Sequence, residues 1–384
     1  NIDDHLREWA LRRFESDEAY FQWQRESLSS EELKSLHKRV EIRRNGSQAE
    51  DVAFYDATAD PRILPVLYSQ RYGYFTAIGS RVISQIGDAR RVLDFGCGVG
   101  ILTTYYACRF PSISFVGIDR SPLSIARAQE QADALGLQNV QFQCLGLPDQ
   151  TPPGLFDLIV ATHSLVQAEQ DPGIPSRDWS TFERVQDAER QRQFEERTGI
   201  GPRLDRLCEA LHPQGRLILF EKTRQLARRI PFQRALAARQ LSLIEEPAPI
   251  RYQIVEEVTD DGLWYVLDRG PQKSILWDES PEPDEGPPFD SAALESVTRR
   301  NDEPLYENHY PSAQHAWERL RRRLIVQERT TTEPDGRQLH VELGQSEEGR
   351  YLYCANTYDQ RQLVLFEPAR ASMLERYYRE IVGA

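Results

Sequence analysis

The segment from Val92 to Gly100, with the sequence VLDFGCGVG, contains the residue types that point most directly to a chemistry. A short apolar run that includes Asp94 leads into Gly96, Gly98 and Gly100, and a helical pattern follows. The segment therefore predicts a buried strand, a tight turn and the start of a helix. Glycines in such a turn let the backbone bend sharply, and they let a ligand approach main-chain N–H groups at the positive end of the helix. This spacing favours a nucleotide-type binding site over an ordinary strand-to-helix turn.

A second acidic residue follows at the spacing that such a site requires. The apolar run from Ser114 to Asp119 predicts another strand, and Asp119 lies nineteen residues after Gly100. A carboxylate at the end of the second strand can accept hydrogen bonds from both hydroxyls of a ribose. The sequence thus predicts that Asp94 and Asp119 belong to one site.

The elements that position these residues repeat in the order strand, helix, strand. Further strands are predicted over residues 140–143, 156–161 and 216–221, with loop and helix signals between them. This order is typical of an α/β protein with a parallel sheet covered on both faces.

Two nucleotide-type ligands compete for the glycine turn. A nicotinamide or flavin dinucleotide requires G-x-G-x-x-G beneath its pyrophosphate, whereas this chain has G-x-G-x-G preceded by Asp94. A carboxylate there would repel a diphosphate and attract an ammonium group. With its hydrophobic pair, acid and G-x-G-x-G, the stretch from about residue 91 to 270 resembles the class I S-adenosylmethionine-dependent methyltransferases. The resemblance implies a Rossmann-like doubly wound sheet, with an antiparallel terminal hairpin expected over residues 241–255 and 263–268.

The resemblance also implies where each part of the methyl donor, S-adenosylmethionine, is held. The donor's amino group would lie near Asp94, and its ribose near Asp119. The remaining implied positions are the turn beneath the methionine portion (Gly96, Cys97, Gly98), the flank of the adenine (Arg120) and the border of the donor after the fourth strand (Thr162, His163).

The chain departs from the family at the adenine. Members often carry an aspartate just after the third strand, and this chain has Cys144 and Leu145 there. We therefore expect main-chain contacts and apolar packing at these two residues to hold the adenine. Leading helices commonly cover the donor site in this family. Tyr72 and Tyr74, in a helix predicted over residues 65–86, are candidates to close the site, with core packing as the alternative.

A candidate general base follows the fourth strand. Methyl transfer from a sulfonium is an in-line displacement, so the protein mainly aligns donor and acceptor and adds a base when the acceptor must lose a proton. His163 is the first candidate and Glu221, at the end of the fifth strand, is the second. A histidine held by backbone contacts is an equally open interpretation. The acceptor is predicted to be a small molecule or a protein side chain; the alternative is a catalytically silent methyltransferase fold that serves as a binding or scaffold partner.

Composition narrows the class of protein. A formal net charge of −13 disfavours nucleic acid as a partner. Two basic clusters, around residues 222–239 and 319–323, are either solvated helix faces or an anionic-substrate site. Five cysteines without a C-x-x-C pair predict reduced thiols in a cytoplasmic protein and no metal site. No apolar run reaches membrane-spanning length, so no membrane partner is expected.

The chain is predicted to divide into four parts. These are a helical N-terminal extension (1–88), the donor-binding domain (89–275) with a lid-like insertion (167–202), an acidic proline-rich linker (276–315), and a C-terminal domain (316–384). Strands over 324–330, 338–343, 351–355 and 362–366 and a helix over 370–381 predict an antiparallel α+β unit. This unit could recognise a substrate, form a homodimer or buttress the first domain.

Overall fold

The computed structural model describes residues 1–383 except 46–47, 168–169, 271–273 and 295–302. The described chain forms two compact units. The first comprises residues 1–171, 191–225 and 232–277, and the second comprises residues 172–190, 226–231 and 278–384. Among the described residues, no helix combines the length and the apolar character needed to cross a bilayer.

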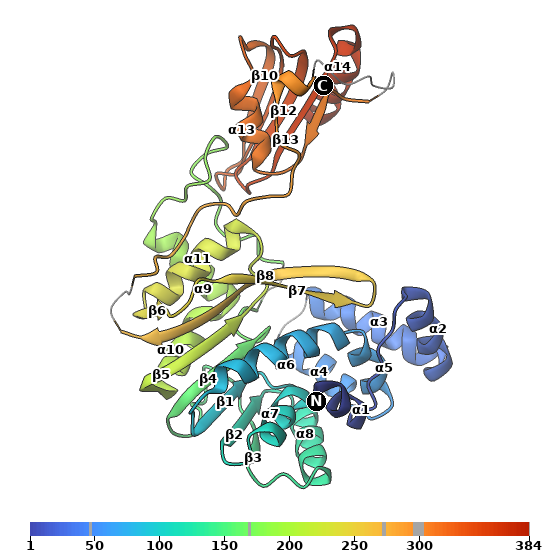
Figure 1. Cartoon of the computed structure of the whole chain (residues 1–384), viewed down its shortest axis with the longest axis vertical. Coiled ribbons are helices and arrows are strands. Elements are labelled where there is room, and N and C mark those ends of the chain that lie inside the picture. Colours follow the sequence, from blue (N-terminus) through green and yellow to red (C-terminus); the bar gives the residue numbers. More distant parts are fainter. Residues whose placement is uncertain (46–47, 168–169, 271–273, 295–302, 384) are drawn as a thin grey trace. The chain divides into compact units, whose positions relative to one another are not determined.

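The first unit is built around an eight-stranded mixed sheet, which confirms the predicted α/β doubly wound architecture (Figure 1). The strand order is β3-β2-β1-β4-β5-β8-β6, and β7 pairs with β8. The first five strands are parallel, and β8 runs antiparallel to β5, β6 and β7. The strands are β1 (Arg91–Phe95), β2 (Ser114–Asp119), β3 (Val140–Cys144), β4 (Phe156–Thr162), β5 (Leu211–Phe220), β6 (Leu241–Leu243), β7 (Ala248–Ile254) and β8 (Glu257–Arg269).

Helices connect and cover these strands. Val92 and Val160 face one hydrophobic core with side chains of α1, α6 and α7, while the side chain of Leu93 points to the opposite face because residues alternate along a strand. The connecting helices are α7 (Ile101–Arg109), α8 (Pro122–Ala134), α9 (Ala188–Thr198), α10 (Ile200–Ala210) and α11 (Leu226–Ala237). The leading helices are α1 (Ile2–Glu8), α2 (Asp17–Ser27), α3 (Ser30–Asn45), α4 (Gln48–Thr58), α5 (Ile63–Ser69) and α6 (Tyr72–Ile86).

The helix predicted over residues 65–86 is in fact two helices. Helix α5 ends at Ser69 and α6 begins at Tyr72, so Arg71 lies in the turn between them. No helix-breaking residue stands at this turn, which is why the periodicity runs through it. Tertiary packing contributes: a Cβ built on Gly73 would lie 2.4 Å from the carbonyl oxygen of Gln253 in β7. The approach of β7 therefore constrains the backbone at the start of α6.

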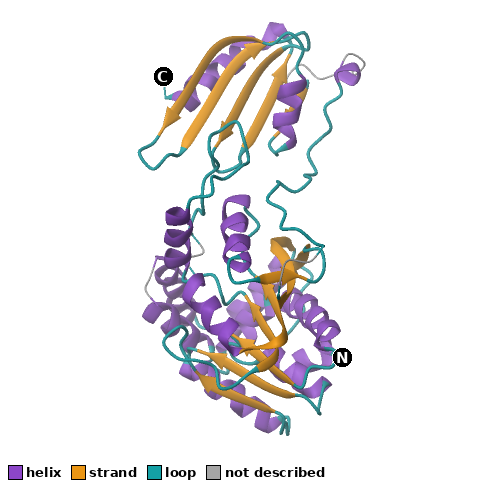
Figure 2. Ribbon diagram, turned by 90° about the vertical axis from the view of Figure 1, so that its left-hand side faces the viewer, coloured by secondary structure: helices purple, strands orange, loops and turns teal. Residues whose placement is uncertain are grey.

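The second unit contains a five-stranded antiparallel sheet in the order β10-β11-β12-β13-β9 (Figure 2). Alternate residues of β12 and β13 face two different hydrophobic clusters, one with α13 and the other with α14. Its elements are α12 (Ser291–Leu294), β9 (Tyr306–Asn308), α13 (Ser312–Arg319), β10 (Leu324–Thr332), β11 (Gln338–Gln345), β12 (Arg350–Asn356), β13 (Arg361–Phe366), the 3-10 turn η1 (Pro368–Arg370) and α14 (Ala371–Val382).

The predicted domain boundaries differ from these units in three places. Residues 1–88 belong to the first unit, because the leading helices share its core. The predicted linker contains β9 and the start of α13, with residues 295–302 outside the description. The predicted lid is divided between the two units. Residues 172–190 belong to the second unit, where the N–H of Ser176 donates to the carbonyl of Thr357, and helix α9 starts at Ala188.

Candidate functional site

The carboxyl ends of β1, β2 and β4 border a cavity of about 640 Å³ in the first unit. The strand order reverses at β1, which is flanked by β2 and β4, and open α/β sheets bind ligands at such a point. Side chains of α3 to α6 form the opposite wall, as the resemblance implied. The cavity is lined by ten of the thirteen predicted site residues: Asp94, Gly96, Cys97, Gly98, Asp119, Arg120, Leu145, Thr162, His163 and Tyr74.

The glycine turn closes over the end of β2. The N–H groups of Gly96 and Cys97 donate to the carbonyl of Ile118 at 2.8 and 3.0 Å, and the N–H of Gly98 donates to Asp119 Oδ2 at 3.0 Å. These three N–H groups therefore bond to residues at the end of β2. The structure differs here from the expectation that they face a ligand. Gly96 has a φ of +73°, and a Cβ there would lie 2.2 Å from Ser164 Cβ. Glycine is required because the loop after β4 passes so close.

Asp94 is a buried acid with a single hydroxyl partner. Asp94 lies next to the last residue of β1, and Thr103 Oγ1 of α7 donates to its carboxylate at 2.5 Å. Asp94 is only 6% exposed, and this burial raises the pKa of its carboxyl to about 6. A cationic ligand beside Asp94 would lower that pKa by favouring the charged form.

Asp119 is held rigidly at the end of β2. Its carboxylate accepts from the N–H of Gly98 and, at 2.9 Å, from the N–H of Ser121. Burial raises the pKa of Asp119, and these backbone donors oppose that effect. A carboxylate has about four lone-pair positions, so capacity remains for hydroxyl donors of a ligand.

His163 lies in a network that links three distant parts of the chain. Arg71 Nη2 is 3.1 Å from Nδ1 of His163, and Asp261 Oδ2 of β8 is 3.1 Å from its Nε2. The imidazole stacks between Tyr74 and Phe220, with ring centroids 5.0 and 5.1 Å away. Burial lowers the pKa of His163 to about 4, although Asp261 opposes this shift. The low pKa keeps the ring neutral at physiological pH, so its unprotonated Nδ1 can accept from Arg71.

Glu221 supports the loop that carries His163 and lies outside the cavity lining. Its carboxylate accepts from the N–H groups of Ser164 at 3.0 Å, Leu165 at 2.8 Å and Val166 at 3.3 Å. Burial raises the pKa of Glu221 to about 7, and the three backbone donors lower it. The predicted role as a base does not fit this placement. The contacts instead hold His163 in a left-handed conformation with a φ of +53°, which costs a non-glycine residue free energy.

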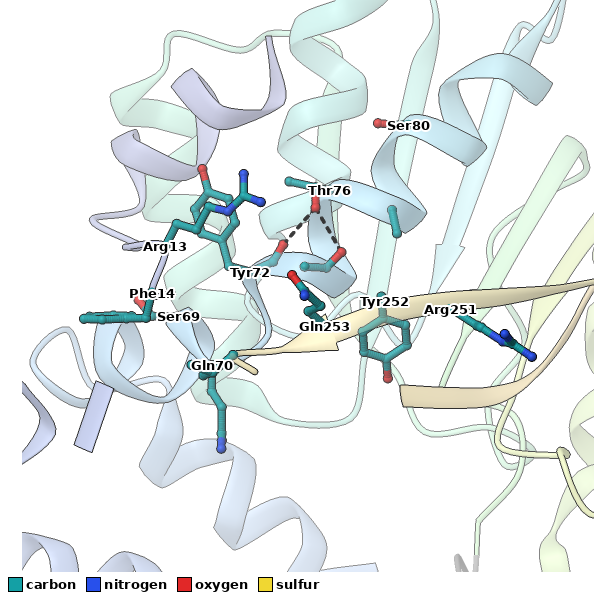
Figure 3. A pocket seen from close by; sticks show the side chains of 13 residues that line it. Arg13, Phe14, Ser69, Gln70, Tyr72, Thr76, Ser80, Arg251, Tyr252 and Gln253 are labelled. Atoms are coloured by element: carbon teal, nitrogen blue, oxygen red, sulfur yellow. Dashed lines mark hydrogen bonds between the residues drawn. The ribbon is translucent and has the colours of Figure 1, made fainter. Parts of the chain in front are cut away.

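Two further predicted residues lie apart from the cavity. The hydroxyl of Tyr72 donates to Asp3 at 2.8 Å, and the ring lines a separate cavity of about 460 Å³ with Arg13, Gln70 and Thr76 (Figure 3). Cys144 is exposed, with its thiol 3.6 Å from the carbonyl of Arg120. Tyr72 and Tyr74 separate because residues two apart on a helix point in different directions.

Sequence reasoning missed two residues of the network, Arg71 and Asp261. Arg71 lies inside the single helix predicted over residues 65–86, and Asp261 falls between the predicted strands of the terminal hairpin. No spacing in the sequence relates either residue to His163. The tyrosines around Arg71 were the available signal, because three of them also line the cavity: Tyr55, Tyr68 and Tyr74.

Comparison with known proteins agrees with this geometry. Residues 92–175 match the family model described as a methyltransferase domain. Trans-aconitate 2-methyltransferase of Streptomyces coelicolor is 30% identical over 26% of this chain and 35% of its own length. Ribosomal protein L11 methyltransferase of Neisseria gonorrhoeae is 37% identical over 20% of this chain and 25% of its own length. The chain thus spans about a third or less of these relatives.

A solved structure gives the same kind of match. The N-methyltransferase NodS from Bradyrhizobium japonicum, in complex with S-adenosyl-L-homocysteine, is 16% identical, with a TM-score of 0.38 over 57% of this chain and 97% of that one. The segment that matches the family model contains the glycine turn and both acids of the cavity. Over residues 92–175 the chain is therefore similar to a methyltransferase domain.

Proposed function

We propose that this chain binds S-adenosylmethionine in the 640 Å³ cavity and transfers its methyl group to a small molecule or a protein side chain. The single observation that carries the proposal is the arrangement of Asp94 and Asp119 on either side of the glycine turn, at the carboxyl edge of the sheet. Three buried polar atoms of lining residues, Arg120 Nη1, His163 Nε2 and Ser164 Oγ, have no hydrogen-bond partner within the described part of the chain. A polar ligand would satisfy such atoms.

The residues present fit the donor's groups. Asp94 suits an ammonium group and Asp119 suits ribose hydroxyls, while Leu145 and Leu147 offer apolar surface. When bound, the donor supplies a methyl group on a sulfonium for in-line displacement. The chain's own contribution is to hold and align the reactants and to exclude water. In this proposal His163 positions Arg71, because its Nδ1 lies 3.1 Å from Nη2 of the guanidinium.

Isothermal titration calorimetry tests the proposal. S-adenosylhomocysteine should bind with one site per chain, and NAD should not bind, because Asp94 opposes a diphosphate. Binding of NAD in place of S-adenosylhomocysteine would contradict the proposal. Production of S-adenosylhomocysteine from S-adenosylmethionine in the presence of an acceptor then separates an active enzyme from a silent methyltransferase fold.

A further inference from the structure

Arg71 is a cavity-lining cation that has no acidic partner among the residues described. It makes one side-chain hydrogen bond there, from Nη2 to His163 Nδ1, although a guanidinium has five N–H donors. By contrast, Arg43 and Arg120, which also line the cavity, both pair with the carboxylate of Asp51. Arg71 is half-buried, so most of its hydrogen-bonding capacity is left for the space that it lines.

The surroundings of Arg71 are aromatic and uncharged. Its guanidinium carbon lies 4.2 Å from the ring centre of Tyr74 and 5.9 Å from that of Phe75. Tyr55 and Tyr68 line the same cavity. Walls of this kind lower the effective dielectric, so the attraction between Arg71 and an anion is stronger than it would be in water. A cation held away from bulk water without a counter-ion is costly, and an anionic ligand would remove that cost.

The charges of the whole cavity lining also favour an anionic ligand. The lining contains the anions Asp51, Asp94 and Asp119 and the cations Arg43, Arg71, Arg120 and Arg203, besides Arg197, which pairs with Asp171 outside the lining. This basic excess contrasts with a chain whose formal net charge is −13. A donor that carries a net positive charge would engage Asp94 and Asp119 and leave the excess larger. The second ligand of the cavity should therefore be negatively charged.

We infer that the methyl acceptor carries a carboxylate and that Arg71 binds it. The inference rests on the proposed function and adds the chemical class of the acceptor. One guanidinium matches one carboxylate, because its planar pair of N–H groups can donate to both oxygens. His163 and Tyr74 would hold the guanidinium in place through the hydrogen bond and the stacking described above. Arg71 is thus a specificity-determining residue for the acceptor.

The test compares wild type, Arg71→Gln and the control Arg90→Gln, which alters an exposed arginine. First, S-adenosylhomocysteine and methylthioadenosine are titrated into each protein by calorimetry; methylthioadenosine lacks the donor's amino-acid portion. Second, each protein saturated with S-adenosylhomocysteine is mixed with acetate, benzoate, succinate or citrate at constant ionic strength, with the matching amides as controls, and Tm is measured.

We expect Arg71→Gln to bind both adenosine ligands within threefold of wild type. At least one carboxylate should raise the Tm of the loaded wild type and of Arg90→Gln, but not that of Arg71→Gln, and no amide should do so. A tenfold or larger loss of S-adenosylhomocysteine affinity in Arg71→Gln, with methylthioadenosine unaffected, would assign Arg71 to the donor's own carboxylate and overturn the inference. Failure of all four carboxylates on loaded wild type would also overturn it. If wild type binds neither adenosine ligand, the proposed function itself fails.

Discussion

The two walls of the large cavity are built in different ways. The sheet-edge wall consists of Asp94, the glycine turn and Asp119, which lie within one continuous strand-helix-strand segment. The covering wall contains Arg71, from the turn before α6, and His163, from the loop after β4; Asp261 of β8 is outside the lining and contacts His163. The first wall is acidic and local in sequence, whereas the second holds an arginine among aromatic side chains and is assembled only by folding. The difference teaches that the sheet-edge wall can be predicted from residue spacing and that the covering wall cannot.

The largest expected effect concerns the support of the covering wall. Glu221→Ala should lower the free energy of unfolding by about 3 kcal/mol or more, because three backbone N–H groups lose their acceptor in a buried setting. Urea denaturation measures the change, and Glu209→Ala, at an exposed residue of α10, is the control. A loss below 0.5 kcal/mol would show that Glu221 does not hold the loop.

On the sheet-edge wall, Asp119→Ala should weaken S-adenosylhomocysteine binding about a hundredfold. The variant removes a charged acceptor that we assign to the ribose, and such hydrogen bonds contribute about 1.5–3 kcal/mol each. Calorimetry measures the affinity, with Asp133→Ala on the exposed side of α8 as the control. Unchanged affinity in Asp119→Ala would remove the ribose assignment.

The ionisation of Asp94 should make donor binding depend on pH. Burial raises its pKa to about 6, and only the charged form attracts an ammonium group. Affinity for S-adenosylhomocysteine should therefore be constant above pH 7 and fall up to about tenfold per pH unit below pH 6. Asp94→Asn should bind more weakly at pH 7.5 and lose this dependence. The same slope in Asp94→Asn would assign the titration to another group.

The smallest effect tests whether the two walls are coupled. Tyr74→Phe removes the hydrogen bond from the tyrosine hydroxyl to Thr162 Oγ1, which measures 2.9 Å and joins the covering wall to the end of β4. We expect a loss of about 1 kcal/mol in the free energy of unfolding and less than a threefold change in donor affinity. Tyr72→Phe removes a comparable bond to Asp3 and should leave donor affinity unchanged. A tenfold loss of donor affinity in Tyr74→Phe, but not in Tyr72→Phe, would show that the donor contacts both walls.

Much of the fold follows from local patterns. The alternating strand and helix signals predicted the parallel order of β1 to β5. Ser29 and Glu32 form a capping box at the start of α3, with bonds of 3.2 and 2.8 Å, and this is also a local pattern. The break at Arg71 escaped prediction because no helix-breaking residue marks it; β7, which is distant in sequence, packs closely against the start of α6 there. The lid predicted over residues 167–202 likewise lacks a local signal for its division, since Ser176 bonds to Thr357, which lies far along the chain.

The sequence alone determined the strand-turn-helix segment. Its glycines and acids contact residues that are a few positions away or one strand and helix further along the chain. It also determined that Asp94 and Asp119 would meet, since parallel strands end at the same edge of a sheet. Only the tertiary structure decided the surroundings of His163 and Arg71. The burial that keeps His163 neutral depends on which distant elements pack together, as does the lack of an acid beside Arg71 among the described residues, and no local pattern contains that information.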